Sequence, residues 1–97
     1  MAKQEWNSKN FLVIRMSWRE YVAATDSWGF CDLCGQQDFD EKEGYYIPAI
    51  DQWYCKVCFD GWLSSATHYP SDREKERERF NKMKIKLQRL GVWHEGL

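Results

Sequence analysis

The sequence predicts a small α+β domain, because short β-prone runs alternate with segments of helical periodicity in a chain of 97 residues. A chain of this length has room for one modest hydrophobic core, so residues 1–97 are expected to form a single domain. Hydrophobic residues make up 43% of the chain and aromatic residues 16%, which is too rich for a disordered polypeptide. Charged residues contribute 30%, as expected of a water-soluble protein.

The N-terminal part of the chain is expected to form a strand followed by a short helix. The segment Phe11–Met16 is β-prone, with aliphatic residues on both sides of its single arginine. Ser17 and Glu20 then have the spacing of a capping box, which favours a helix start in the segment WREYVAATDSW.

The same apolar run also bears on the compartment in which the protein works. Phe11–Ile14 is interrupted by Arg15 and is far shorter than a signal sequence or the roughly 20 residues of a membrane span. The sequence therefore predicts a cytoplasmic protein without a membrane segment. Thiols in that compartment are kept reduced, so disulfides are the second interpretation of the cysteines.

Four cysteines form two C-x-x-C pairs, in the segments CDLCG and WYCKVC, with twenty residues between the pairs. Two such pairs can direct four thiolates to one point, which is the tetrahedral donor set of Zn²⁺. Iron and free buried thiols are the other interpretations. A site closed by four protein ligands leaves no coordination position for a substrate, so one zinc ion with a structural role is expected. Its predicted ligands are Cys31, Cys34, Cys55 and Cys58.

The segments around the two pairs predict how the site is built. Gly35 can take the positive φ that a tight metal-binding knuckle requires. The β-prone runs Tyr45–Ile47 and Gln52–Tyr54 predict a hairpin. Apolar residues at helical spacing after Cys55 place Cys58 in the first turn of a helix, where a thiolate is stabilised by the helix dipole. The aromatic residues around this pair are expected to pack in the core rather than to stack on nucleic-acid bases; they are Trp53, Tyr54, Phe59 and Trp62.

A knuckle, a hairpin and a helix with the second cysteine pair together resemble the treble-clef class of zinc fingers, over residues 28–69. The resemblance implies a Cys₄ zinc site, and it is shared by nucleic-acid-binding proteins, protein-interaction modules and some nucleases. The segments GYYIP and WYCKVCFDGWL are also similar to segments of small uncharacterised proteins of bacteria and their phages. That similarity implies a phage or mobile-element protein acting on a host factor.

A long amphipathic helix is predicted over residues 71–90. Ser71 and Glu74 repeat the capping-box spacing after Pro70, and Gly91 supplies the stop. An apolar stripe at steps of three and four residues is expected to face the core; it consists of Phe80, Met83, Leu87 and Leu90. The first half of the helix, SDREKERER, contains no apolar residue and is expected to project into solvent.

Beside the apolar stripe, steps of 100° align five cations in what is here named the basic stripe. It comprises Lys75, Arg79, Lys82, Lys86 and Arg89. The wheel places Ile85 next to Lys82 and Arg89, so Ile85 is expected to be exposed and to be the apolar anchor of a partner contact. The alternative is a solvated face whose long side chains cover the edge of the core.

The charge distribution favours a protein partner over a nucleic acid. The net charge is −1, which is not the basic balance usual in nucleic-acid-binding domains. Residues 26–60 carry eight acidic side chains against two lysines, whereas residues 72–89 carry eight basic against four acidic ones. This uneven distribution of charge suits binding to a protein with the opposite charge pattern, or to a second copy of the chain. A nucleic-acid-binding finger that uses the basic stripe remains the alternative function.

Catalysis is not predicted. The only imidazoles are those of His68 and His94, and neither has the arrangement by which treble-clef nucleases hold a second metal. No nucleophile, base and orienting group can be assembled from the sequence. His68 is expected to interact with the C-terminus of the finger helix, and His94 to lie in a tail.

Overall fold

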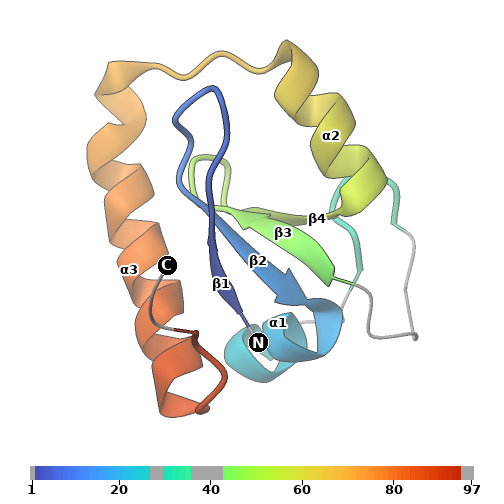
Figure 1. Cartoon of the computed structure of the whole chain (residues 1–97), viewed down its shortest axis with the longest axis vertical. Helices are drawn as coiled ribbons and strands as arrows, with labels where there is room; N and C mark the ends of the chain where they lie inside the picture. Colours follow the sequence, from blue (N-terminus) through green and yellow to red (C-terminus); the bar gives the residue numbers. More distant parts are fainter. Residues whose placement is uncertain (1, 27–29, 36–42, 95–97) are drawn as a thin grey trace.

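The computed structural model describes residues 2–26, 30–35 and 43–94, which form a four-stranded antiparallel sheet and three α-helices (Figure 1). The elements follow the order β1 (Lys3–Glu5), β2 (Val13–Ser17), α1 (Trp18–Thr25), β3 (Glu43–Ile47), β4 (Gln52–Cys55), α2 (Lys56–Ser65), the 3₁₀ turn η1 (Pro70–Asp72) and α3 (Arg73–Arg89). Each strand pairs with its neighbour in sequence, in the order β1-β2-β3-β4. The α+β class is confirmed, together with the N-terminal strand and helix, the hairpin and the C-terminal helix. β1 was not predicted.

Both faces of the sheet are covered by helices, and the pleat of β3 decides which side chains face which helix. Tyr45 stacks on Phe59 of α2, with ring centroids 4.2 Å apart. The next residue, Tyr46, points to the opposite face, where it lies opposite Trp53 of β4. On that face Tyr21 of α1 stacks on Trp53 at 5.8 Å. A helix on each face explains why the four consecutive residues 44–47 of β3 are all buried.

The aromatic residues around the second cysteine pair are core residues, as predicted. Trp53, Tyr54 and Phe59 are buried, and Trp62 is half-buried. Gly44 of β3 allows the Trp53 ring to lie directly against the strand, because a Cβ at this position would collide with the indole. These rings therefore do not form an exposed platform for nucleic-acid bases.

Two of the three helix-end signals predicted from the sequence are present in the structure. Ser17 and Glu20 form the capping box of α1, in which the Glu20 amide donates to Ser17 Oγ and the Ser17 amide to Glu20 Oε1. At Gly91, φ is +73°, and the amide of the following residue donates to Leu87, as in a Schellman motif. The capping box predicted at Ser71 and Glu74 is wrong. Residues 70–72 form η1 instead, so α3 begins two residues later than predicted, at Arg73.

The apolar stripe of α3 is buried except at its last position. Phe80, Met83 and Leu87 belong to the core, whereas Leu90 is 46% exposed, which contradicts its predicted core position. The Schellman turn reverses the chain at this point, and Trp93 packs edge-on against Phe80 instead. Trp93 also forms a parallel bridge with Ala2, and the His94 amide donates to the Ala2 carbonyl. The segment around His94 is thus held at the N-terminal strand and is not a free tail.

The first half of α3 does not project into solvent, because the carboxylate of Glu76 is completely buried. Glu76 Oε2 accepts the Leu12 amide at 2.9 Å, and Oε1 lies 3.1 Å from His68 Nε2 and 3.0 Å from a guanidinium nitrogen of Arg73. His68 therefore lies beyond the end of α2 and contacts Glu76 rather than the helix C-terminus. The β1–β2 loop contributes further bonds, from Lys9 to Ala66 and from Arg73 to Asn10.

The carboxylate of Glu76 thus joins three segments: the β1–β2 loop, the α2–α3 connection and the first turns of α3. A buried charge without its partners is strongly destabilising, and so are buried donors without their acceptor. Its burial was missed because a glutamate was not read as a core residue. The signal was available, since position 76 lies one turn before Phe80, on the face of the helix that also carries Met83 and Leu87.

We expect Glu76→Ala to lower the free energy of unfolding by about 3–5 kcal/mol, because it leaves the Leu12 amide, His68 and Arg73 without their shared acceptor. Urea unfolding followed by tryptophan fluorescence measures the change. Glu78→Ala is the matched control on the same helix, since Glu78 is exposed and should change the stability by less than about 0.5 kcal/mol. Equal effects of the two substitutions would contradict the role assigned to Glu76.

Along the described part of the chain, no helix combines the length and apolar character needed to cross a membrane.

Candidate metal centre

The four cysteines come from two places that the fold brings together. Cys31 and Cys34 lie on the turn after α1, in the described segment 30–35, and Cys55 is the last residue of β4. Cys55 is also the N-cap of α2, so Cys58 lies in the first turn of that helix, as predicted. The junction of β4 and α2 therefore fixes the positions of Cys55 and Cys58. The turn with Cys31 and Cys34 is held beside them by contacts between residues that are distant in sequence.

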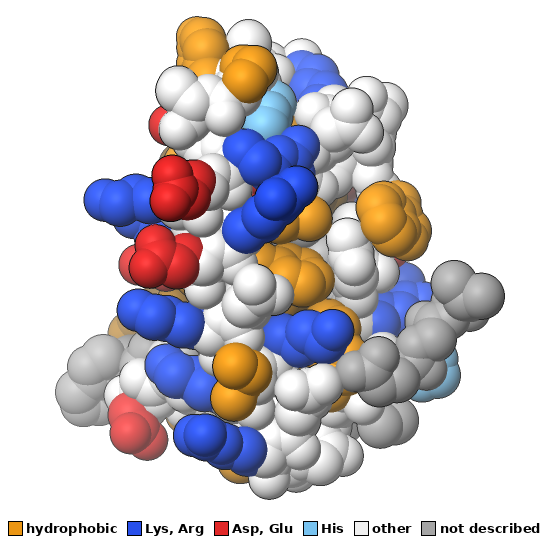
Figure 2. Space-filling model, turned by 90° about the vertical axis from the view of Figure 1, so that its left-hand side faces the viewer, with side chains coloured by type: hydrophobic (Ala, Val, Ile, Leu, Met, Phe, Trp, Pro, Cys, Tyr) orange, Lys and Arg blue, Asp and Glu red, His pale blue; other side chains and the backbone are white. Residues whose placement is uncertain are grey.

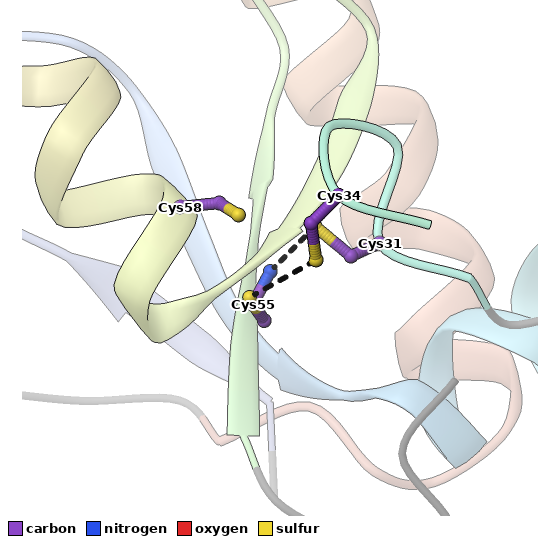
Figure 3. Close-up of side chains that lie close together, drawn as sticks. All are labelled: Cys31, Cys34, Cys55 and Cys58. Carbon is purple, nitrogen blue, oxygen red and sulfur yellow. Dashed lines mark hydrogen bonds between the residues drawn. The ribbon is translucent and has the colours of Figure 1, made fainter. Parts of the chain in front are cut away.

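The sulfur atoms converge on one point (Figure 3). All four Sγ atoms lie within 4.8 Å of one another, and the Sγ atoms of Cys34 and Cys55 are 4.0 Å apart. A tetrahedral zinc site with Zn–S bonds of about 2.3 Å has sulfur–sulfur edges of about 3.8 Å, so only small movements separate this cluster from a bound geometry. The four residues could hold one metal ion, and thiolate donors suit zinc or iron.

The turn with the first pair is fixed by hydrogen bonds to itself and to β4. The Gly35 amide donates to the Cys31 carbonyl at 2.8 Å, and Gly35 has φ of +73°, as expected for a metal-binding knuckle. Asp32 and Trp53 exchange two bonds, from the Asp32 amide to the Trp53 carbonyl and from the Trp53 amide to the Asp32 carboxylate, both of 2.9 Å. The Asp32–Trp53 pair thus attaches the turn to the strand that ends in Cys55.

The thiols differ in how readily they ionise. Burial raises the pKa of the Cys58 thiol, and hydrogen bonds with the neighbouring thiols raise it further. Burial also opposes ionisation of Cys31, but hydrogen bonds from the backbone at Cys34, Cys55 and Leu33 outweigh it and lower the pKa of Cys31 to about 7. The Cys55 amide donates to the Cys31 sulfur at 3.4 Å. Because a metal must displace the remaining protons, its affinity should increase with pH.

The exposure of the cluster is graded: Cys31 is buried, Cys55 and Cys58 are half-buried, and Cys34 is exposed. Four thiolates complete a tetrahedron, so a metal held by all four has no vacant position for water or substrate. The arrangement can hold the first cysteine pair, the end of β4 and the start of α2 together. This is the chemistry of a site that stabilises a fold.

Comparison of the chain with protein-family models, curated proteins and solved structures finds no match.

The basic stripe lies on α3, where Lys75, Lys82, Lys86 and Arg89 are exposed. Arg79 differs from them, because it is half-buried and its guanidinium donates to the carbonyls of Pro48 and Ala49 in the β3–β4 turn. Part of its donor capacity is therefore used within the fold. Ile85 is 46% exposed, as the helical wheel predicts. The stripe and the cysteine cluster lie on different elements and share no residue.

If the four cysteines hold one metal, elemental analysis of protein purified without added metal should find about one equivalent, and a colourless preparation would identify it as zinc rather than iron. Cys58→Ser removes one ligand and should disorder the region around the cluster, since metal binding in such sites contributes about 10–16 kcal/mol to folding in peptides. Circular dichroism measures the loss of ordered structure, and elemental analysis measures the metal content. Reduced, folded protein without metal would contradict the assignment.

Proposed function

We propose that this protein is a non-enzymatic, zinc-stabilised module that binds a protein partner through the exposed face of α3. The zinc ion has a structural role in this proposal and is held by Cys31, Cys34, Cys55 and Cys58. Support comes from the clustering of the four Sγ atoms at the junction of β4 and α2, where a metal would fix the end of the sheet to the helix.

The proposed type of finger is a treble clef. The order of the elements supports it, because a knuckle at Cys31–Gly35 is followed by the β3–β4 hairpin and then by α2 with the second pair. This class hosts interaction modules as well as enzymes, so the fold by itself does not select a function. The choice of a protein-binding function therefore rests on the exposed residues of α3.

The observation that carries the proposal is the exposed apolar side chain of Ile85 among cations of α3. Lysine and arginine side chains gather along this face of the molecule, with hydrophobic side chains between them (Figure 2). An apolar centre with a charged rim is a common composition of protein contact surfaces. Lys82 and Arg89 are the nearest rim residues on the helical wheel, and their charge would steer an acidic partner.

The proposal of a non-enzymatic role is supported by the state of the histidines. The imidazole of His68 is committed to Glu76 and packs edge-on against Phe11, so it has a structural explanation. The backbone amide of His94 donates a hydrogen bond to the Ala2 carbonyl. Neither side chain is joined in the described segments to a nucleophile. A phage or mobile-element protein acting on a host factor remains a prediction that rests on the sequence resemblance.

A test of the contact surface uses Ile85→Asp in the protein recovered from its native cell. If Ile85 is the centre of a contact, the substitution should abolish copurification of the partner while the melting temperature and metal content stay unchanged. The matched control is Val57→Asp, because Val57 is also exposed but lies in the first turn of α2. Full partner recovery with Ile85→Asp would contradict the proposed surface.

The alternative is a nucleic-acid contact through the basic stripe, which the exposure of Lys75, Lys82, Lys86 and Arg89 favours. We expect only weak association with DNA or RNA, lost as salt is raised, because few phosphates can be reached from one helix face. A fluorescence titration at several salt concentrations measures this. Tight binding at physiological salt, with a slope that falls by about one for each lysine replaced, would favour the nucleic-acid function instead.

A further inference from the structure

A cleft of about 500 Å³ lies between α1, α3 and the β3–β4 turn. It is separate from the cysteine cluster, and four parts of the chain contribute to it. The lining residues are Tyr21 and Thr25 of α1, Tyr46 of β3, Asp51 of the turn, and Arg79, Lys82, Met83 and Lys86 of α3. Its volume is within the range of sites for small molecules.

The cleft is electropositive. Arg79, Lys82 and Lys86 follow one another at steps of three and four residues, so they lie along the side of α3 that borders the cleft. Among the described residues that line the cleft, Asp51 is the one carboxylate. It is already an acceptor, because Tyr46 donates its hydroxyl proton to Asp51 Oδ1 at 2.5 Å. Three cations against one engaged carboxylate leave an excess of about two positive charges, which suits a dianion.

The wall of the cleft is held in place by contacts within the fold. Tyr21 stacks on Trp53 and lies against Tyr46, with ring centroids 6.2 Å apart. Arg79 donates to the Pro48 carbonyl at 3.1 Å, which ties α3 to the β3–β4 turn. Tyr21, Tyr46 and Arg79 are therefore already held in place when a ligand enters, and this lowers the entropic cost of binding.

The phenols of the cleft are hydrogen-bond donors at neutral pH. Burial raises the pKa of Tyr21 to about 12, and the charges of Asp32 and Asp51 contribute in the same direction. Burial and the bond to Asp51 likewise raise the pKa of Tyr46. Tyr21, which lines the cleft, thus keeps its hydroxyl proton at neutral pH and can donate a hydrogen bond.

We propose that this cleft binds a phosphate monoester, with Lys82 and Lys86 contacting the phosphate oxygens and with Tyr21 and Met83 contacting the esterified group. Lysine is a common phosphate ligand because its ammonium acts as a compact positive charge. A cleft of about 500 Å³ has room for an organic group beside the phosphate. The inference goes beyond the proposed protein contact, since it assigns a class of small ligand to the cleft, although Lys82 belongs to both surfaces.

The test is isothermal titration of the metal-loaded, full-length chain with phenyl phosphate at low ionic strength. We expect saturable binding with one site, weaker binding of inorganic phosphate, and an affinity that falls as salt is added. Replacement of both cations by Lys82→Gln and Lys86→Gln should lower the affinity by at least about tenfold. The matched control is Lys75→Gln, because Lys75 belongs to the basic stripe but does not line the cleft; its affinity should stay within about twofold.

A second variant tests the sign of the electrostatic effect. Asp51→Asn removes the carboxylate found among the described lining residues and keeps an oxygen that can accept the Tyr46 proton, so this variant should bind phenyl phosphate more tightly. Asparagine also tolerates the left-handed conformation of this position, where φ is +53°. No saturable binding, or equal loss of affinity with Lys75→Gln and with the Lys82 and Lys86 double variant, would overturn the proposal.

The ester can belong to a small molecule or to a phosphorylated side chain of a protein, and a phosphotyrosyl peptide with acidic flanks distinguishes them. A peptide that binds more tightly than phenyl phosphate, and that loses this advantage with Lys75→Gln, indicates a phosphorylated protein. Equal affinities indicate a free ester. The outcome is separate from the proposed protein contact, because loss of partner recovery with Ile85→Asp does not depend on phenyl phosphate binding.

Discussion

The pleat of the β3–β4 hairpin is the constraint on which the rest of the structure depends. Because successive side chains of a strand point to opposite faces, Tyr45 faces α2 and Tyr46 faces α1 and the cleft beside α3. The partner strand repeats the division, with Tyr54 and Trp53 opposite them. Two aromatic layers are thus built from four neighbouring residues, and each layer holds a different set of helices. A shift of one residue in this register would exchange the two layers.

The hairpin also separates the cysteine cluster from the surface of α3 that we propose as a binding site. The cysteine cluster lies where β4 ends and α2 begins, while the basic stripe and the cleft lie on α3 and on the α1 side of the sheet. In Figure 1 the turn with the first cysteine pair and helix α3 lie on opposite sides of the sheet. A metal at the cluster would therefore support the proposed binding surface of α3 only indirectly, by fixing β4.

The buried carboxylate of Glu76 joins segments of the fold that do not carry the cysteine cluster. α3 has few apolar residues in its first half, and the core does not extend there. One carboxylate replaces the missing apolar contacts by accepting hydrogen bonds from Leu12, His68 and Arg73. A single charged group can do this because its two oxygens accept several bonds at once, and because charge-assisted bonds are stronger than neutral ones.

The sequence by itself determined the features that arise from neighbouring residues. The capping box at Ser17, the positive φ of Gly35, the hairpin and the position of Cys58 in a helix all follow from local spacing, and all are present. The two C-x-x-C pairs predicted that their four sulfur atoms lie close together, because this spacing is typical of zinc sites. Tertiary structure alone decided the pairing of β1, the exposure of Leu90, the partners of the buried Glu76 carboxylate and the cleft at Tyr21 and Lys82. These features depend on segments that meet only after folding, so the energy of each is set by partners that local sequence does not specify.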